Sequence, residues 1–164
     1  MPRRREAADR AILLAAVRIF GEAGYAAAGM DRIAAAANLT KGALYWYFQD
    51  KEALFRETVV FVTRRAAEAV FGGAADARDI RRRLAVWERA DPAGLAFLHR
   101  AHAEFMARPD DGAAAPLCDW HRELQRLIGD EAWKAWLVES QPFLRTCVVR
   151  DGPEPSLGGE PPGP

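Results

Sequence analysis

Two short helical segments joined by a very tight turn constrain the fold of this chain more than any other feature. Apolar residues at helical spacing predict one segment from about residue 30 to 37 and another from about 40 to 48. The turn between them, Asn38-Leu39, requires a positive φ, which asparagine adopts more readily than most residues. Thr40 is placed to cap the following segment. The arrangement predicts a helix-turn-helix, whose second helix enters the major groove of DNA.

Longer helices are expected on both sides of this pair. The helix before it should end at Gly21 and Gly24. After the pair, Asp50 can cap a helix from about residue 51 to 71, which Gly72-Gly73 stops. The apolar positions of the first helix are Ile12, Leu13, Ala16, Ile19 and Phe20.

Four consecutive aromatic residues, 45–48, end the second segment of the pair. Leu44 and Phe48 lie four apart and share a face, with Tyr45 beside it, so these three are expected to pack on the first helix. Small residues at Gly42 and Ala43 would let the backbone approach base edges and phosphates. Tyrosine hydroxyls and the tryptophan N–H can reach phosphate oxygens. The positions expected to point partly outward are Lys41, Gly42, Trp46 and Tyr47. An ordinary exposed aromatic pair is the alternative for Trp46 and Tyr47.

The distribution of charge is compatible with nucleic-acid binding, although the net charge of the chain is zero. Residues 1–48 hold seven basic and four acidic residues, a balance of +3, and the remainder holds 16 basic and 19 acidic residues, a balance of −3. A mildly basic head on a mildly acidic body permits DNA binding without demanding it. The run Arg3-Arg4-Arg5 is expected either as a disordered, solvated arm or as an arm that reaches the minor groove or a phosphate.

Composition favours a cytoplasmic protein with one domain, or with a small module joined to a modest second one. The chain has 164 residues, and none of its apolar runs reaches the roughly 18–20 residues that cross a bilayer. The basic N-terminus lacks the uncharged apolar core of a signal peptide. Two cysteines, Cys118 and Cys147, do not make a disulfide framework.

Further helices are predicted after residue 73, over about 76–90, 92–107 and 117–138. Residues 151–164 are rich in proline and glycine and are expected to be disordered.

His99/His102 and Cys118/His121 have the spacing of helical metal-ligand pairs, but no acidic or cysteine cluster accompanies them. The simpler interpretation is that these side chains pack against their neighbours or lie on the polar surface, so no metal or other cofactor is expected. No nucleophile–base set, phosphate loop or carboxylate pair stands out, so no enzymatic activity is predicted.

The segment from Ile12 to Leu54 resembles the DNA-binding head of the TetR-type transcriptional regulators. The resemblance rests on IL-x-AA-x-x-x-F-x-x-x-GY at 12–25, IA-x-x-A at 33–37 and LTKGALY-x-YF-x-x-KEAL at 39–54. It implies an all-α fold and DNA contacts from the third helix, with Lys51 on a phosphate at the start of the fourth. One departure is Ala28-Gly29, where the family often has Thr or Ser. The implied DNA-binding residues are Thr40, Lys41, Gly42, Ala43, Tyr45, Trp46, Tyr47 and Lys51.

The resemblance also implies a homodimer that binds a palindromic operator and a small-molecule effector. Aromatic residues of the body could line the effector pocket or could simply form its core. The candidate pocket residues are Trp87, His102, Phe105 and Trp120.

The predicted organisation has four parts: a disordered basic arm (1–8), a helix-turn-helix domain (9–50), a helical regulatory body (51–139) and a disordered tail (140–164). The expected function is that of a ligand-responsive repressor. Family members usually carry two further long helices that pair across a two-fold axis, and this chain is expected to lack room for both. One alternative is therefore a truncated relative without working dimerisation, or a frame-shifted reading after about Gln141. In another, the region of Trp133 and Trp136 provides a different dimer surface. A third is a helical small-molecule or metal-binding protein.

Overall fold

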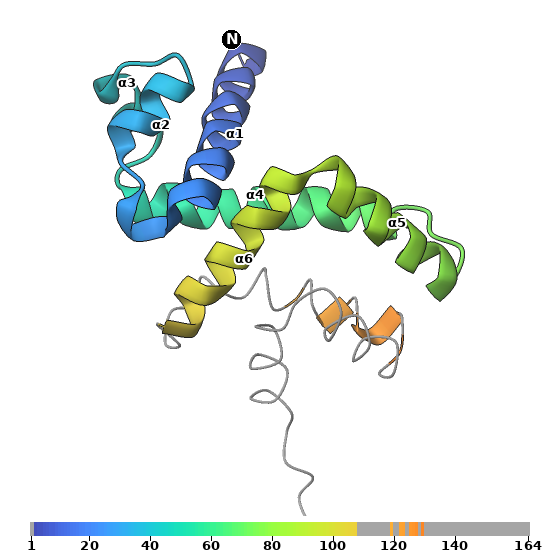
Figure 1. Cartoon of the computed structure of the whole chain (residues 1–164). Coiled ribbons are helices and arrows are strands. Elements are labelled where there is room, and N and C mark those ends of the chain that lie inside the picture. The colour runs from blue at the N-terminus through green and yellow to red at the C-terminus, as the bar shows by residue number, and fades with distance from the viewer. Residues whose placement is uncertain (1, 108–118, 120–121, 124, 128, 130–164) are drawn as a thin grey trace, which may run out of the picture.

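The computed structural model describes residues 2–107, 119, 122, 123, 125–127 and 129 (Figure 1). Its elements are α1 (Pro2–Ala27), α2 (Met30–Ala36), α3 (Lys41–Tyr47), α4 (Lys51–Phe71), α5 (Ala77–Ala90) and α6 (Pro92–Ala107). The all-α class is confirmed, and the part of the chain that the structure describes contains no strand. None of these helices is long and apolar enough to cross a membrane. Within the helix predicted over 117–138, the structure describes residues 119, 122, 123 and 125–127, which are helical, and Gly129, which has a φ of 80°. The tail over 140–164 and Trp120, Trp133 and Trp136 lie outside the described residues.

Helix α1 begins at Pro2, so residues 2–8 are helical and not the disordered arm that was predicted. Proline fits the first helical position because its missing N–H would have no partner there. The arginines, glutamate and alanines that follow are strong helix formers. Local propensity therefore extends the helix well before its first buried apolar residue, Ile12.

The two glycines near the end of α1 have different roles. Gly24 has a φ of 77° and a ψ of 169°, and it breaks the regular helix as predicted. Gly21 does not end the helix. A Cβ on Gly21 would lie 3.2 Å from the backbone nitrogen of Phe97, so the glycine lets α6 pack closely on α1.

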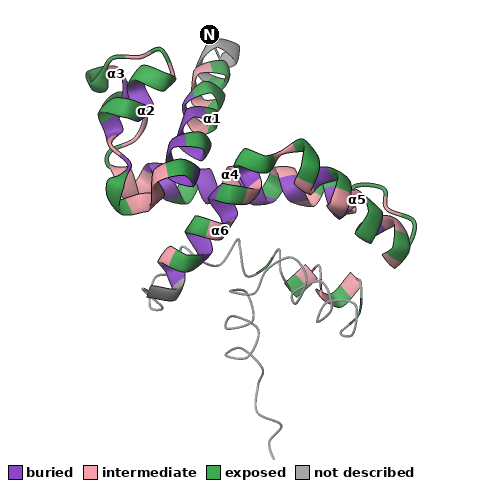
Figure 2. Cartoon of the chain, in the orientation of Figure 1, coloured by how far each residue is buried: buried purple, intermediate pink, exposed green. Residues whose placement is uncertain are grey.

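The core lies where α1, α4 and α6 meet (Figure 2). Phe20 of α1, Phe55 of α4 and Phe97 of α6 are almost completely buried. The ring centroids of Phe20 and Phe55 are 5.1 Å apart, and those of Phe55 and Phe97 are 5.6 Å apart. Burying each ring stabilises the fold by about 1.5–3 kcal/mol. This aromatic cluster ties the first fifty residues to the helices that follow them. The boundary between a head (9–50) and a body (51–139) stays a prediction.

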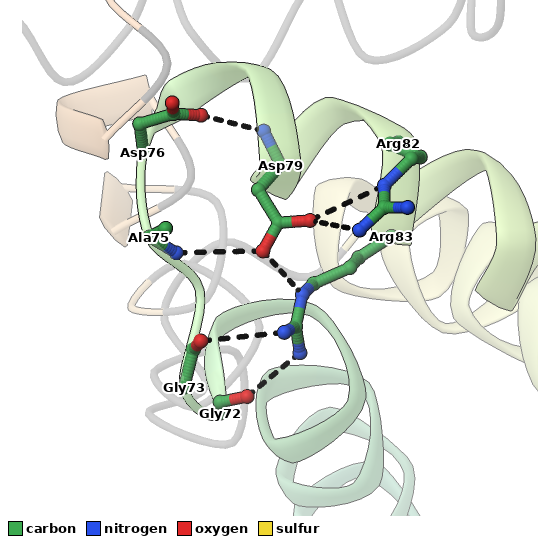
Figure 3. A network of polar contacts seen from close by, with 7 residues as sticks. All are labelled: Gly72, Gly73, Ala75, Asp76, Asp79, Arg82 and Arg83. Atoms are coloured by element: carbon green, nitrogen blue, oxygen red, sulfur yellow. Dashed lines mark hydrogen bonds and ion pairs between the residues drawn. The ribbon is translucent and has the colours of Figure 1, made fainter.

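A polar network closes the turn between α4 and α5 (Figure 3). Arg83 donates hydrogen bonds to the carbonyl oxygens of Gly72, at 2.7 Å, and Gly73, at 3.3 Å. Asp79 accepts from Arg82 at 2.6 Å and from Arg83 at 2.8 Å, and these bonds lower its pKa to about 2. Asp76 caps α5 by accepting from the backbone N–H of Asp79. The turn is therefore fixed by charge-assisted hydrogen bonds as well as by packing.

Candidate nucleic-acid interface

The turn between α2 and α3 is built around Asn38, which has the predicted positive φ, 59°. The Asn38 N–H donates to the carbonyl of Ala35 at 3.1 Å, and the Leu39 N–H donates to the carbonyl of Ala34 at 2.8 Å. This is the Schellman pattern of helix termination, with asparagine in the left-handed position. Leu39 then packs against the core. Two helices are thus joined by a short turn of fixed geometry, as in a helix-turn-helix.

The start of α3 is capped as predicted. The hydroxyl oxygen of Thr40 accepts a hydrogen bond from the Ala43 N–H at 3.2 Å. Gly42 is exposed, and a Cβ built on it would have no neighbour within 4 Å. The packing of the protein itself therefore does not require a glycine here. A glycine at this position keeps the α3 backbone open to a partner outside the chain.

The aromatic run of α3 divides between core and solvent. Leu44 is completely buried, and Phe48 is half-buried against the core, in agreement with the expected packing face. Tyr45, which was expected to pack beside them, is 43% exposed. Trp46 is 68% exposed, and its ring meets Tyr47 edge-on with a centroid distance of 4.9 Å. Tyr47, which was expected to point partly outward, is half-buried, because its ring also packs on the core.

Lys41 extends from the first turn of α3 and pairs with Asp31 of α2. Its ammonium nitrogen lies 3.1 Å from an Asp31 carboxylate oxygen. The hydrogen bond to Asp31 raises the pKa of Lys41, so the side chain is cationic at neutral pH. Both side chains are largely exposed, and water weakens such pairs. A phosphate could therefore replace Asp31 as the partner of Lys41.

Lys51 makes hydrogen bonds to the backbone of the protein itself. Its ammonium donates hydrogen bonds to the carbonyl oxygens of Tyr25 at 2.9 Å, Ala26 at 3.2 Å and Ala28 at 3.2 Å. The same nitrogen lies 4.5 Å from the centroid of the Tyr25 ring. The structure thus brings Lys51 to the end of α1 and to the link that follows it.

Comparison with known proteins identifies this part of the chain. Residues 12–58 match the model of the bacterial regulatory proteins of the tetR family. Residues 12–58 are a TetR-family domain. Within a segment of 46 residues, the chain is 46% identical to the HTH-type transcriptional regulator AcrR of Shigella flexneri. That segment spans 28% of this chain and 21% of the length of the relative.

Solved structures extend the likeness in fold beyond the TetR-family domain. A TetR family transcription regulator from Marinobacter aquaeolei VT8 is 25% identical, with a TM-score of 0.63 over 89% of this chain and 80% of its own. A protein from Rhodococcus sp., described as of the TetR family, is 22% identical, with a TM-score of 0.62 over 87% of this chain and 81% of its own. These structures share the helical architecture that follows the TetR-family domain.

Of the candidate effector residues behind the TetR-family domain, Trp87 borders a surface hollow. Trp87, His102 and Phe105 are all buried, and the ring of Phe105 lies 5.7 Å from that of Phe55. A surface hollow of about 340 Å³ borders α4 and α5 and includes Trp87, but neither His102 nor Phe105 lines it. Its lining residues are Ala69, Arg82, Arg83, Val86, Trp87 and Ala90. Trp120, the fourth candidate, lies outside the described residues.

The two pairs that have the spacing of metal ligands, His99/His102 and Cys118/His121, are only partly described. His102 is buried on α6, and burial, with a smaller effect of His99, lowers its pKa to about 4. Cys118 and His121 lie outside the described residues. Among those that are described, no group of three or more His, Cys, Asp or Glu side chains could hold a metal ion.

Sequence reasoning missed the residues that hold Lys51 and Lys41 in place. The carbonyl oxygen of Tyr25 accepts a hydrogen bond from Lys51 at 2.9 Å, and Asp31 pairs with Lys41. One signal for the first contact was available. Lys51 stands in the first turn of α4, where the helix dipole disfavours a cation, so a tertiary partner was to be expected.

Proposed function

We propose that this chain is a sequence-specific DNA-binding transcription regulator of the TetR type and acts in the cytoplasm. In this proposal α3 enters the major groove, and its first turn faces the DNA. The residues proposed to contact DNA from α3 and its cap are Thr40, Lys41, Gly42, Ala43, Tyr45, Trp46 and Tyr47.

The observation that carries this proposal is the exposed face of α3 on a turn of fixed geometry. Trp46 is 68% exposed, and Gly42 has open space around it. Neither residue is part of the buried core, and both stand on a helix of seven residues, where an exposed glycine lowers helix propensity. Together with Lys41, they provide a polar ring edge, a bare backbone and a cation, which are the groups that hold a phosphate backbone and approach base edges.

We further propose that the protein is a repressor that works as a homodimer and responds to a small molecule. The family resemblance supports this part. Two heads of a dimer would bind successive major grooves ~34–36 Å apart on a palindromic operator. An effector that binds the other dimer conformation more tightly would shift the population away from DNA. Catalysis has no part in this proposal.

The test is a fluorescence-anisotropy titration of the protein against the intergenic DNA beside its own gene. A scrambled duplex of equal length is the control, and both titrations are repeated over a series of salt concentrations. We expect salt-dependent binding that strongly prefers the native fragment, with two protomers per site. Equal, weak binding to both duplexes would contradict a sequence-specific regulator. A single protomer per site would contradict the dimeric mechanism alone.

A further inference from the structure

The position of Lys51 in its own helix is unfavourable. It is the first residue of α4, directly after the capping residue Asp50. A cation in the first turn opposes the helix dipole, which favours negative charge there. A cation would stabilise the end of α1, because the last carbonyl groups of a helix lack partners within the helix. The last turn of α1 itself has no basic residue. Lys51 brings the missing positive charge to α1 from a different helix.

The contacts of Lys51 account for all of its donors. A lysine ammonium has three N–H groups, and three carbonyl oxygens lie within 2.9–3.2 Å of the nitrogen. Two of these carbonyls, from Tyr25 and Ala26, lie in the last turn of α1 after the break at Gly24. The Tyr25 ring lies against the same ammonium. To reach a DNA phosphate, Lys51 would have to give up these partners.

The third carbonyl belongs to the link between α1 and α2. Only Ala28 and Gly29 separate the two helices. The Ala28 N–H donates to the carbonyl of Gly24 at 3.1 Å, and its carbonyl accepts from Lys51. The Tyr25 hydroxyl, bound to Glu52, adds a second connection from the end of α1 to the start of α4. The direction in which the chain enters α2 is therefore tied to α4.

We propose that Lys51 is a positioning residue and not a phosphate ligand. Its hydrogen bonds to the carbonyls of Tyr25, Ala26 and Ala28, the lysine clamp, fix the orientation of α2 and α3 relative to α1 and α4. Because α3 follows α2 through a turn of fixed geometry, the lysine clamp sets the angle at which α3 meets DNA. This inference rests on the proposed DNA-binding function.

Salt dependence distinguishes a positioning residue from a phosphate ligand. Each phosphate contact that is lost reduces the slope of log K against log[salt] by about 0.9. The variants are Lys51→Met and, as a matched control, Lys41→Met, titrated against the same intergenic duplex. We expect Lys51→Met to lower the affinity roughly tenfold with an unchanged slope, because charged hydrogen bonds are lost within the protein. Lys41→Met should reduce the slope by about 0.9 per bound protomer.

A second variant separates the charge of Lys51 from its geometry. Lys51→Arg keeps the cation, and a phosphate contact would be retained or improved by the guanidinium. The lysine clamp needs a compact ammonium among three converging carbonyls, so we expect Lys51→Arg to lose affinity as well. A Lys51→Met slope reduced as in the control, retained affinity in Lys51→Arg, or unchanged affinity in Lys51→Met would each overturn the proposal.

Hydrogen exchange tests the lysine clamp without DNA. In the free protein, Lys51→Met should lower the protection of the Ala28 amide and of α2, while Lys41→Met leaves the Ala28 amide protected. Unchanged protection in Lys51→Met would overturn the proposal. If the wild-type protein does not bind DNA, the proposed function fails, but this measurement still decides whether the lysine clamp holds the link between α1 and α2.

Discussion

Gly21 of α1 lies directly against the backbone of Phe97 in α6, and a Cβ on Gly21 would lie 3.2 Å from the Phe97 nitrogen and 3.4 Å from the Ala93 carbonyl oxygen. Both neighbours are backbone atoms, so they cannot move aside as a flexible side chain could. Two helices that approach each other through a glycine leave no room for a branched side chain.

Gly21→Val should therefore destabilise the protein by about 1–3 kcal/mol, because the added methyl groups force α1 and α6 apart. The free energy of unfolding from urea titration gives the measurement. Gly42→Val is the control, since Gly42 has open space, and it should stay within about 0.5 kcal/mol of the wild type. Equal stability of the two variants would contradict the close packing of α1 on α6.

Leu44 and Phe48 should differ in what their truncation costs. Leu44 is completely buried, so Leu44→Ala should cost about 2–5 kcal/mol. Phe48 is half-buried and ends α3, so Phe48→Ala should cost less than the roughly 3–5 kcal/mol of a fully buried phenylalanine. Thermal unfolding followed by circular dichroism compares the two. A larger loss for Phe48→Ala than for Leu44→Ala would mean that α3 is held mainly by its last ring.

Trp46→Ala should separate DNA affinity from stability. The side chain is 68% exposed, so its removal should change the free energy of unfolding by no more than about 0.5 kcal/mol. DNA affinity should fall, because the indole N–H and ring are proposed to meet the phosphate backbone. Anisotropy titration and urea unfolding of the same sample give both values. A variant with unchanged affinity would show that Trp46 is an ordinary exposed aromatic residue.

The stability of the fold should fall between about pH 6.5 and pH 4 because of His102. Burial lowers the pKa of His102 from 6.5 to about 4, so in this range the unfolded chain binds a proton that the folded chain does not. The neutral form stabilises the fold fully above pH 6.5, and this contribution, at most about 3 kcal/mol, is lost as the pH falls to 4. Urea unfolding at several pH values should show a flatter profile for His102→Gln. An equally steep profile would assign the pH dependence to other groups.

The helix boundaries were predictable because the sequence carries their local signals. Thr40 and Asp50 accept the capping hydrogen bonds expected of them, and Asn38 adopts the expected positive φ. These features depend on residues only a few positions apart. The extension of α1 to Pro2 also has a local cause, the strong helix propensity of residues 2–8. The prediction of a disordered arm gave more weight to the charge of these residues than to their helix propensity.

The contacts that sequence patterns could not supply all join distant parts of the chain. From its neighbours in sequence, Gly21 cannot be distinguished from any other glycine near a helix end. Its role depends on the packing of α6 at Phe97, 76 positions later in the sequence. The sequence around Lys51 predicts a surface cation, and only the fold brings it to the carbonyls of Tyr25, Ala26 and Ala28. Tyr45 is 43% exposed although its spacing places it beside Leu44 and Phe48, because spacing alone does not fix which side of α3 faces the core.

The left-handed backbone of Asn38 limits how this chain can diverge by mutation. Glycine and aspartate can adopt the same conformation, whereas most other residues cost about 1–2 kcal/mol there. A β-branched residue would be the poorest replacement. Single-nucleotide changes from an asparagine codon reach aspartate, serine and lysine, but glycine requires two. In the turn between α2 and α3, substitutions are therefore tolerated less well at Asn38 than at neighbouring positions. Aspartate is the replacement that needs one nucleotide change and keeps the backbone conformation.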